Sequence, residues 1–154
     1  TEEIDRGTLE WLRVAPVSMT DVVDGKLLAA AGLAPAQAAL WVLLLELNGT
    51  SVSNVPALLV LVAAMALLVC SVGAAVALLA PERRAAQLLY SLGVLLVFGG
   101  TAVFPNGPIN AAARLAIGSA SGIEYAAVGA VVIASLAAYL GLRGIVGRVD
   151  PDAL

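Results

Sequence analysis

The fold is decided by residues 55–80, which read VPALLVLVAAMALLVCSVGAAVALLA and carry no charged side chain. A helix needs about 20 apolar residues to cross a hydrocarbon core about 30 Å thick. On either side of this stretch, residues 27–47 are uncharged apart from Glu46, and residues 85–104 and 125–142 carry no charge. The sequence therefore predicts four membrane spans, at about residues 27–47, 55–80, 85–104 and 123–142.

The composition leads to the same class of protein. Hydrophobic residues make up 61% of the chain and charged residues 12%, whereas soluble domains carry about 25% charged residues. In lipid, an open strand edge would leave peptide groups without hydrogen-bond partners, and a barrel would alternate apolar and polar residues. Residues 58–64 (LLVLVAA) do not alternate. We therefore expect an all-α polytopic membrane protein, with the lipid bilayer as its surroundings.

Several kinds of site are not expected from the residue types present. The net charge is −3 and no basic tract occurs, so nucleic acid is not an expected partner. One cysteine, Cys70, and no histidine exclude a disulfide or a Cys/His zinc site within the chain. No stretch matches the ATP-binding pattern GxxxxGK[ST], because Gly25-Lys26 is followed by Leu27. We expect no catalytic residue, metal or cofactor in this chain.

The basic residues predict the orientation of the spans. Cytoplasmic loops of membrane proteins carry an excess of lysine and arginine. If the amino terminus is cytoplasmic, Arg114 lies outside and seven bases lie inside: Arg6, Arg13, Lys26, Arg83, Arg84, Arg143 and Arg148. We therefore expect a multi-pass protein of the plasma membrane with both ends of this chain in the cytoplasm.

The charged start, Thr1 to Lys26, does not resemble a signal peptide, and we interpret the chain as a piece of a longer protein.

Small residues recur every four positions near the end of the chain. This spacing places them on one stripe of a helix, where a second helix can approach closely. A shorter stripe of Ala66, Cys70 and Ala74 has alanine-rich composition as an equally good explanation. The longer stripe predicts a helix-packing face formed by Gly122, Ala126, Ala130, Ala134 and Ala138.

Two acids, Glu46 and Glu124, stand at the predicted outer ends of spans. Acids inside a membrane often mark a path for ions or substrates. At a membrane boundary, however, a solvated carboxylate is the commoner state. We expect both side chains to be solvated, with lining of an outer vestibule as the alternative.

The amino-terminal residues predict an amphipathic helix followed by a sharp turn. On a helix of 100° per residue, the charged side chains of residues 2–15 gather on one arc and the apolar ones, including Trp11, lie opposite. Pro16 ends this helix, and Ser18 with Asp21 has the spacing of a capping box for the next one. Residues 2–15 fit an interfacial helix anchored by Trp11 and a docking helix for a soluble partner equally well. The mixed sign of the charged arc slightly favours the protein partner.

Residues 2–18, EEIDRGTLEWLRVAPVS, followed by Gly25-Lys26-Leu27-Leu28, resemble the signature loop of ABC-2-type ABC transporter permeases. Arg13 departs from the family pattern, which commonly has a small or polar residue there. The resemblance implies that residues 1–17 are a cytoplasmic coupling helix that docks on a separate ATPase subunit. It also implies that residues 18–154 hold four spans, with an outer loop at 105–122 containing a short helix near residues 109–118.

The resemblance implies further partners. ATP and Mg would be bound by the ATPase subunit, two permease copies or halves would form a dimer, and export would be the activity. The two spans that precede the signature loop in the family would lie outside this chain. The residues expected to dock on the ATPase are Gly7, Thr8, Leu9, Glu10, Trp11, Leu12, Arg13, Pro16, Val17 and Ser18.

Two other functions remain open from the sequence. A membrane scaffold or assembly protein would use the small-residue stripe to bind other helices and would need no ATPase. A membrane enzyme would need polar groups that converge inside the bilayer, and the sequence pattern offers none.

Overall fold

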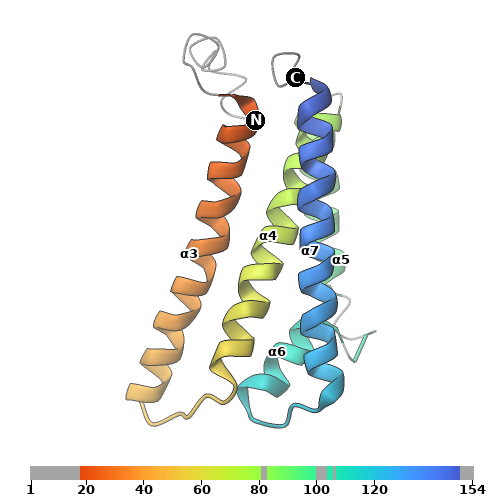
Figure 1. Cartoon of the computed structure of the whole chain (residues 1–154). Helices are drawn as coiled ribbons and strands as arrows, with labels where there is room; N and C mark the ends of the chain where they lie inside the picture. The colour runs from red at the N-terminus through yellow and green to blue at the C-terminus, as the bar shows by residue number, and fades with distance from the viewer. Residues whose placement is uncertain (1–17, 81–82, 100–103, 106, 150–154) are drawn as a thin grey trace.

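The computed structural model describes residues 18–80, 83–99, 104–105 and 107–149. These ranges hold helices and no strand, which confirms the all-α expectation for the described part of the chain. The helices, shown in Figure 1, are α3 (Met19–Leu47), α4 (Val55–Leu79), α5 (Arg83–Gly99), α6 (Pro108–Ala116) and α7 (Gly122–Val149).

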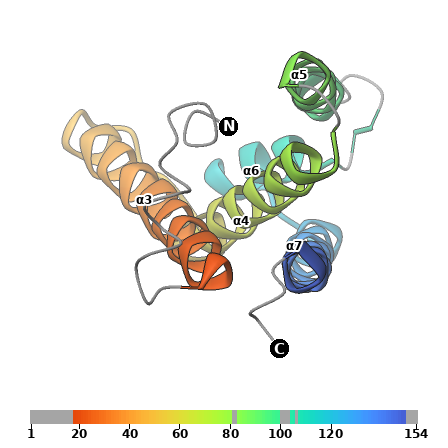
Figure 2. The same cartoon turned by 90° about the horizontal axis from the view of Figure 1, so that it is seen from above.

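The long helices form a bundle with two ends (Figure 1). We call the end where α3 begins and α4 and α7 finish the N-terminal end, and the other the α6 end. Helix α4 is central, since it contacts α3, α5, α6 and α7. Seen from above, α3, α5 and α7 stand around it on different sides (Figure 2). Helices α4 and α7 run in the same direction, from the α6 end to the N-terminal end.

Helix α3 begins where the sequence predicts, at a capping box. The Asp21 N–H donates to Ser18 Oγ at 3.1 Å, and the Ser18 N–H donates to Asp21 Oδ2 at 3.2 Å. These bonds satisfy amide groups that the first turn of a helix leaves without partners. The helix then continues for 29 residues, through Pro35, into the first predicted span.

Turn chemistry sets the limits of α4. Asn54, the residue before the helix, has φ of 51° in the left-handed region, which asparagine tolerates better than most residues. Pro56 occupies the first turn, where its missing N–H costs no hydrogen bond. At the other end Ala80 is extended, the conformation favoured before a proline, and Pro81 follows in the sequence.

Three helices are long and apolar enough to cross a membrane: Thr20–Leu47, Val55–Leu79 and Gly122–Arg148. They correspond to the first, second and fourth predicted spans, and the first and fourth are longer than predicted. Helix α5 has 17 residues, or about 25 Å at 1.5 Å per residue, which is shorter than a typical hydrocarbon core. Phe104, the predicted end of the third span, is not helical. The chain is therefore a membrane-spanning protein with three candidate spans in its described part.

The interior of the bundle consists of two hydrophobic clusters. The cluster at the N-terminal end joins three helices through Leu27 of α3 and Leu142 and Val146 of α7, with side chains of α4 packed against them. The cluster at the α6 end joins Leu61 of α4, Leu115 of α6 and Val128 of α7. Because lipid tails are as apolar as leucine, close packing rather than water exclusion holds such helices together.

Two serines of the long helices are buried, Ser71 on α4 and Ser135 on α7. Small side chains at such positions allow neighbouring helices to approach closely. The Ser135 hydroxyl donates to the backbone oxygen of Val132 at 2.8 Å. The Ser71 hydroxyl, with 0% exposure, has no hydrogen-bond partner within the described part of the chain.

Replacing Ser71 with alanine is expected to raise the free energy of unfolding by about 1 kcal/mol, because a buried hydroxyl without a partner is removed. The matched variant Ser135→Ala loses the bond to Val132 and should show no such gain. Unfolding of the detergent-solubilised protein, followed by circular dichroism, measures both. A loss of stability in Ser71→Ala would mean that the hydroxyl does have a partner.

The predicted small-residue stripe does not face the rest of the bundle. Gly122, Ala126, Ala130 and Ala134 are exposed, and Ala138 is half-buried. Helix α7 instead buries a different face against α4 and α6, made of Glu124, Val128, Ser135, Leu142 and Val146. Within this chain the stripe is therefore not the packing face of α7, and contact with a helix of another molecule stays a prediction. In the shorter stripe, Cys70 and Ala74 do pack against the Leu27 cluster.

Candidate functional site

A clamp of three side chains joins α3 to α7 at the N-terminal end. The Tyr139 hydroxyl donates to Asp24 Oδ1 at 3.0 Å, and Arg143 Nη2 lies 3.3 Å from Asp24 Oδ2. The Arg143 guanidinium carbon also lies 5.8 Å from the centre of the Tyr139 ring. Both oxygens of one carboxylate on α3 are thus held by two residues of α7.

The local sequence explains this geometry. Tyr139 and Arg143 are four residues apart and therefore share one face of α7. Asp24 lies one turn beyond the capping box of α3, so the beginning of that helix fixes its direction. The clamp lies within two turns of Ser18, where α3 meets the amino-terminal segment.

The docking residues predicted for the ATPase are outside the described residues, with one exception. Ser18 is described, and it caps α3 as the spacing to Asp21 predicts. The coupling helix at residues 1–17, including Gly7, Thr8, Leu9, Glu10, Trp11, Leu12, Arg13, Pro16 and Val17, lies outside the described ranges and stays a prediction.

A second group of polar residues closes the α6 end. Glu124, the third residue of α7, is 3% exposed. Its Oε1 lies 2.6 Å from Arg114 Nη1, and its Oε2 accepts bonds from the Ser121 N–H at 2.7 Å and the Ser121 hydroxyl at 2.5 Å. The expected solvated state is therefore wrong for Glu124. Both of its oxygens bind protein donors, and its role is to hold α6 against α7.

Glu46, the other acid at a span end, is in a different environment. It is exposed near the end of α3. This exposure fits the expected solvated carboxylate, which stays a prediction for Glu46. The structure does not show the two carboxylates side by side in a vestibule, and lining of a vestibule by Glu46 stays a prediction.

Backbone contacts hold the short helix α6 in place. The Ser53 N–H donates to the Ala116 oxygen at 2.8 Å, and Asn54 Nδ2 donates to the Leu115 oxygen at 3.1 Å. Asn54 Oδ1 in turn accepts a bond from the Tyr125 hydroxyl at 2.8 Å. The turn before α4, the end of α6 and the start of α7 are thus one hydrogen-bonded unit.

Gly118 is required where α6 turns toward α7. Its φ is +75°, and a Cβ built on it would lie 2.9 Å from Ser53 Oγ. Any other residue would suffer both backbone strain and a clash. The sequence expectation of a short helix near residues 109–118, ahead of the last span, agrees with α6 in position.

The sequence reasoning missed the clamp and most of this unit. A signal existed for the clamp, since Tyr139 and Arg143 stand four residues apart near the end of an apolar span. A signal also existed for the ion pair, because Arg114 is the one base in the predicted outer loop and Glu124 the one acid near it. No group of three or more His, Cys, Asp or Glu side chains within the described ranges could hold a metal ion.

Comparison of the chain with protein-family models, with curated proteins and with solved structures gave no match.

Proposed function

We propose that this chain is part of the permease subunit of an ABC-2-type ABC transporter, an exporter driven by ATP on a separate ATPase subunit. The observation that carries the proposal is the junction at Ser18. The signature-like residues 2–18 end at the residue that caps α3, and α3 then continues without a break for 29 residues into the bundle. A docked segment joined directly to a long span is what mechanical coupling to an ATPase requires.

In the proposed mechanism the ATPase grips residues 1–17 as its two copies close on ATP and Mg. The turn predicted from the sequence at Pro16-Val17 would pass this movement to α3. Asp24 then transfers part of it to α7 through Tyr139 and Arg143, which bind both carboxylate oxygens. Substrate would pass along the interface between two permease copies or halves. The exposed stripe that begins at Gly122 would serve as a helix contact there.

The proposal places the N-terminal end of the bundle in the cytoplasm of a cell bounded by its plasma membrane. This orientation rests on the basic residues, since Lys26, Arg84, Arg143 and Arg148 belong to one end and Arg114 to the other. Arg114 is paired with Glu124, so its charge is compensated on the outer side. A fourth crossing, by α5 and the residues that follow it, is part of the same proposal.

Copurification tests the proposal. The full chain, tagged at its carboxyl end, would be expressed together with a candidate ABC ATPase from the same genome. We expect the ATPase to remain bound through size-exclusion chromatography in detergent, and its ATP hydrolysis to change on binding. An ATPase that separates from the chain in both detergent and reconstituted bilayers would contradict the proposal.

A membrane scaffold is the second candidate function. The exposure of Gly122, Ala126, Ala130 and Ala134 on α7 favours it, because such a face can receive a helix of another protein. A scaffold would form stable complexes through α7 and would not respond to an ATPase. The copurification experiment therefore separates the two candidates.

A further inference from the structure

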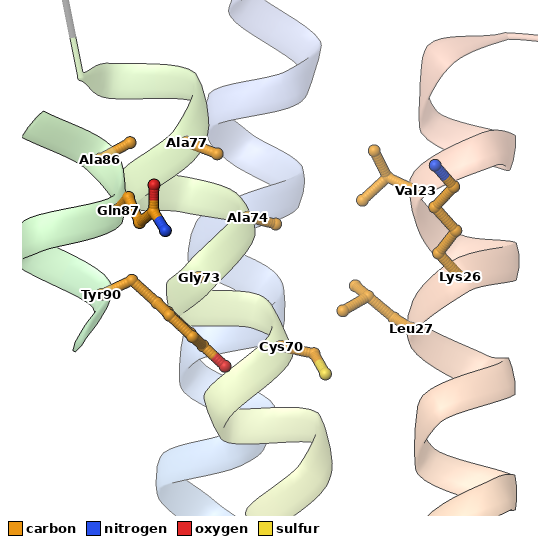
Figure 3. Close-up of a pocket in the computed structure, with 10 residues that line it drawn as sticks. All are labelled: Val23, Lys26, Leu27, Cys70, Gly73, Ala74, Ala77, Ala86, Gln87 and Tyr90. Atoms are coloured by element: carbon orange, nitrogen blue, oxygen red, sulfur yellow. The ribbon is translucent and has the colours of Figure 1, made fainter. Parts of the chain in front are cut away.

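A groove opens at the N-terminal end of the bundle between α3, α4 and α5 (Figure 3). Its volume is about 580 Å³, within the range of small-molecule sites. Small residues of α4, from Cys70 through Gly73 to Ala77, form its floor. Helices α3 and α5 form the walls, since each contacts α4.

The wall on the α5 side depends on a glycine. A Cβ built on Gly73 would lie 2.9 Å from Cε2 of Tyr90, so the Tyr90 ring lies directly against α4 at this position. The side chain runs across α4 in the direction of Cys70, with its hydroxyl leading (Figure 3). Gln87, one turn earlier on α5, brings an amide to the same groove.

Polarity is distributed unevenly along the groove. Lys26 is its only charged lining residue within the described part of the chain, and its ammonium is directed toward the N-terminal end (Figure 3). The nearby acid Asp24 is engaged by Tyr139 and Arg143. Lys26 already has an interaction within the protein, but an ammonium has three donors and can hold a second acceptor beside the first. The groove is thus mainly apolar, with one positive charge at its mouth.

The lining of the groove selects the occupant. The floor from Cys70 to Ala77 is apolar and about 10 Å long at 1.5 Å per residue, which suits an extended hydrocarbon chain. Charge complementarity with Lys26 then requires an anionic head group at the mouth.

We propose that this groove binds an anionic membrane lipid, with an acyl chain along Cys70, Gly73 and Ala77 and the phosphate at Lys26. Tyr90 and Gln87 supply donors for the ester and glycerol oxygens between chain and phosphate. Lipid binding here is independent of the proposed ATPase docking, so each can fail while the other remains measurable.

Native mass spectrometry of the purified full chain tests the head-group part. The probes are dioleoyl phosphatidylglycerol and dioleoyl phosphatidylcholine, which have the same acyl chains. One lysine near a lipid phosphate contributes about 1 kcal/mol, so we expect about fivefold preference for the anionic lipid.

Lys26→Gln should abolish this preference. The matched control Arg148→Gln removes a charge from an exposed residue at the same end and should retain it. Equal binding of both lipids, or a preference that survives in Lys26→Gln, would overturn the proposal.

The single cysteine of the chain reports on the groove itself. N-ethylmaleimide labelling of Cys70 in detergent should slow as phosphatidylglycerol is added. In a second experiment, Ala77→Phe, whose larger side chain fills the floor of the groove, should reduce lipid binding. Circular dichroism of each variant verifies that its helices are intact. Labelling that is blocked with or without lipid would show that protein fills the groove, and labelling unaffected by lipid would show that lipid binds elsewhere. Either result excludes the proposed site.

Discussion

Replacing Trp11 with glutamate is expected to abolish copurification of the chain with the proposed ATPase subunit. Trp11 lies on the apolar arc of the predicted amphipathic helix, and aromatic anchors at the centre of an interface contribute 2 kcal/mol or more. Glutamate would remove the ring and place an unpaired charge in the groove of the partner. We expect the dissociation constant to rise on the order of 100-fold, measured by retention of the ATPase on the tagged chain.

The matched control for this substitution is Glu2→Gln, which changes the charged arc and leaves the predicted docking residues intact. It should retain the ATPase. The same pair of variants separates docking from membrane anchoring. If Trp11 is an interfacial anchor instead, Trp11→Glu leaves the ATPase bound at its original affinity, and the docking role is then wrong.

Leu115→Ala is expected to cost about 2–5 kcal/mol in the free energy of unfolding. The Leu115 side chain is 0% exposed and packs between Leu61 of α4 and Val128 of α7. Its backbone oxygen is held by Asn54, so α6 cannot easily shift to fill the cavity that alanine would leave. Loss of van der Waals contacts is the main cost, because membrane helices gain little from water exclusion.

Ile117→Ala is the matched control, two residues further along. Ile117 is 75% exposed, and its truncation should change stability by no more than about 0.5 kcal/mol. Denaturant unfolding in detergent, followed by circular dichroism, measures both variants. Equal effects of the two substitutions would mean that α6 is not packed between α4 and α7 as described.

Helix limits that depend on residues close together in the chain were predictable from the sequence. The uncharged run at residues 55–80 predicted α4 to within one residue of its end. Ser18 and Asp21 predicted the beginning of α3, since a capping box depends only on residues three apart. Length, composition and local turn chemistry determine these features, and all three can be read directly along the chain.

Features that depend on which face meets a neighbour were not predictable. Residues 125–142 of α7 carry no charge on any face, so hydrophobic periodicity does not distinguish the buried side of the helix from the exposed one. The spacing of Gly122 and Ala126 suggested a packing face, but α4 and α6 contact the side of α7 that carries Val128 and Ser135. Glu124 was misjudged for a similar reason. Its burial depends on α6 folding back to bring Arg114 within 2.6 Å, and no local pattern encodes that return.

The uneven burial of α3 along its length has a mechanical consequence. Among the α3 side chains that the structure describes, Leu27 is the one buried hydrophobic residue, and no residue from 28 to 47 is buried. From Asp24 to Leu47 the helix spans about 35 Å, so a tilt of about 10° around Asp24 would carry Leu47 sideways by about 6 Å. A small stroke delivered beside Ser18 would thus be amplified at the opposite membrane surface.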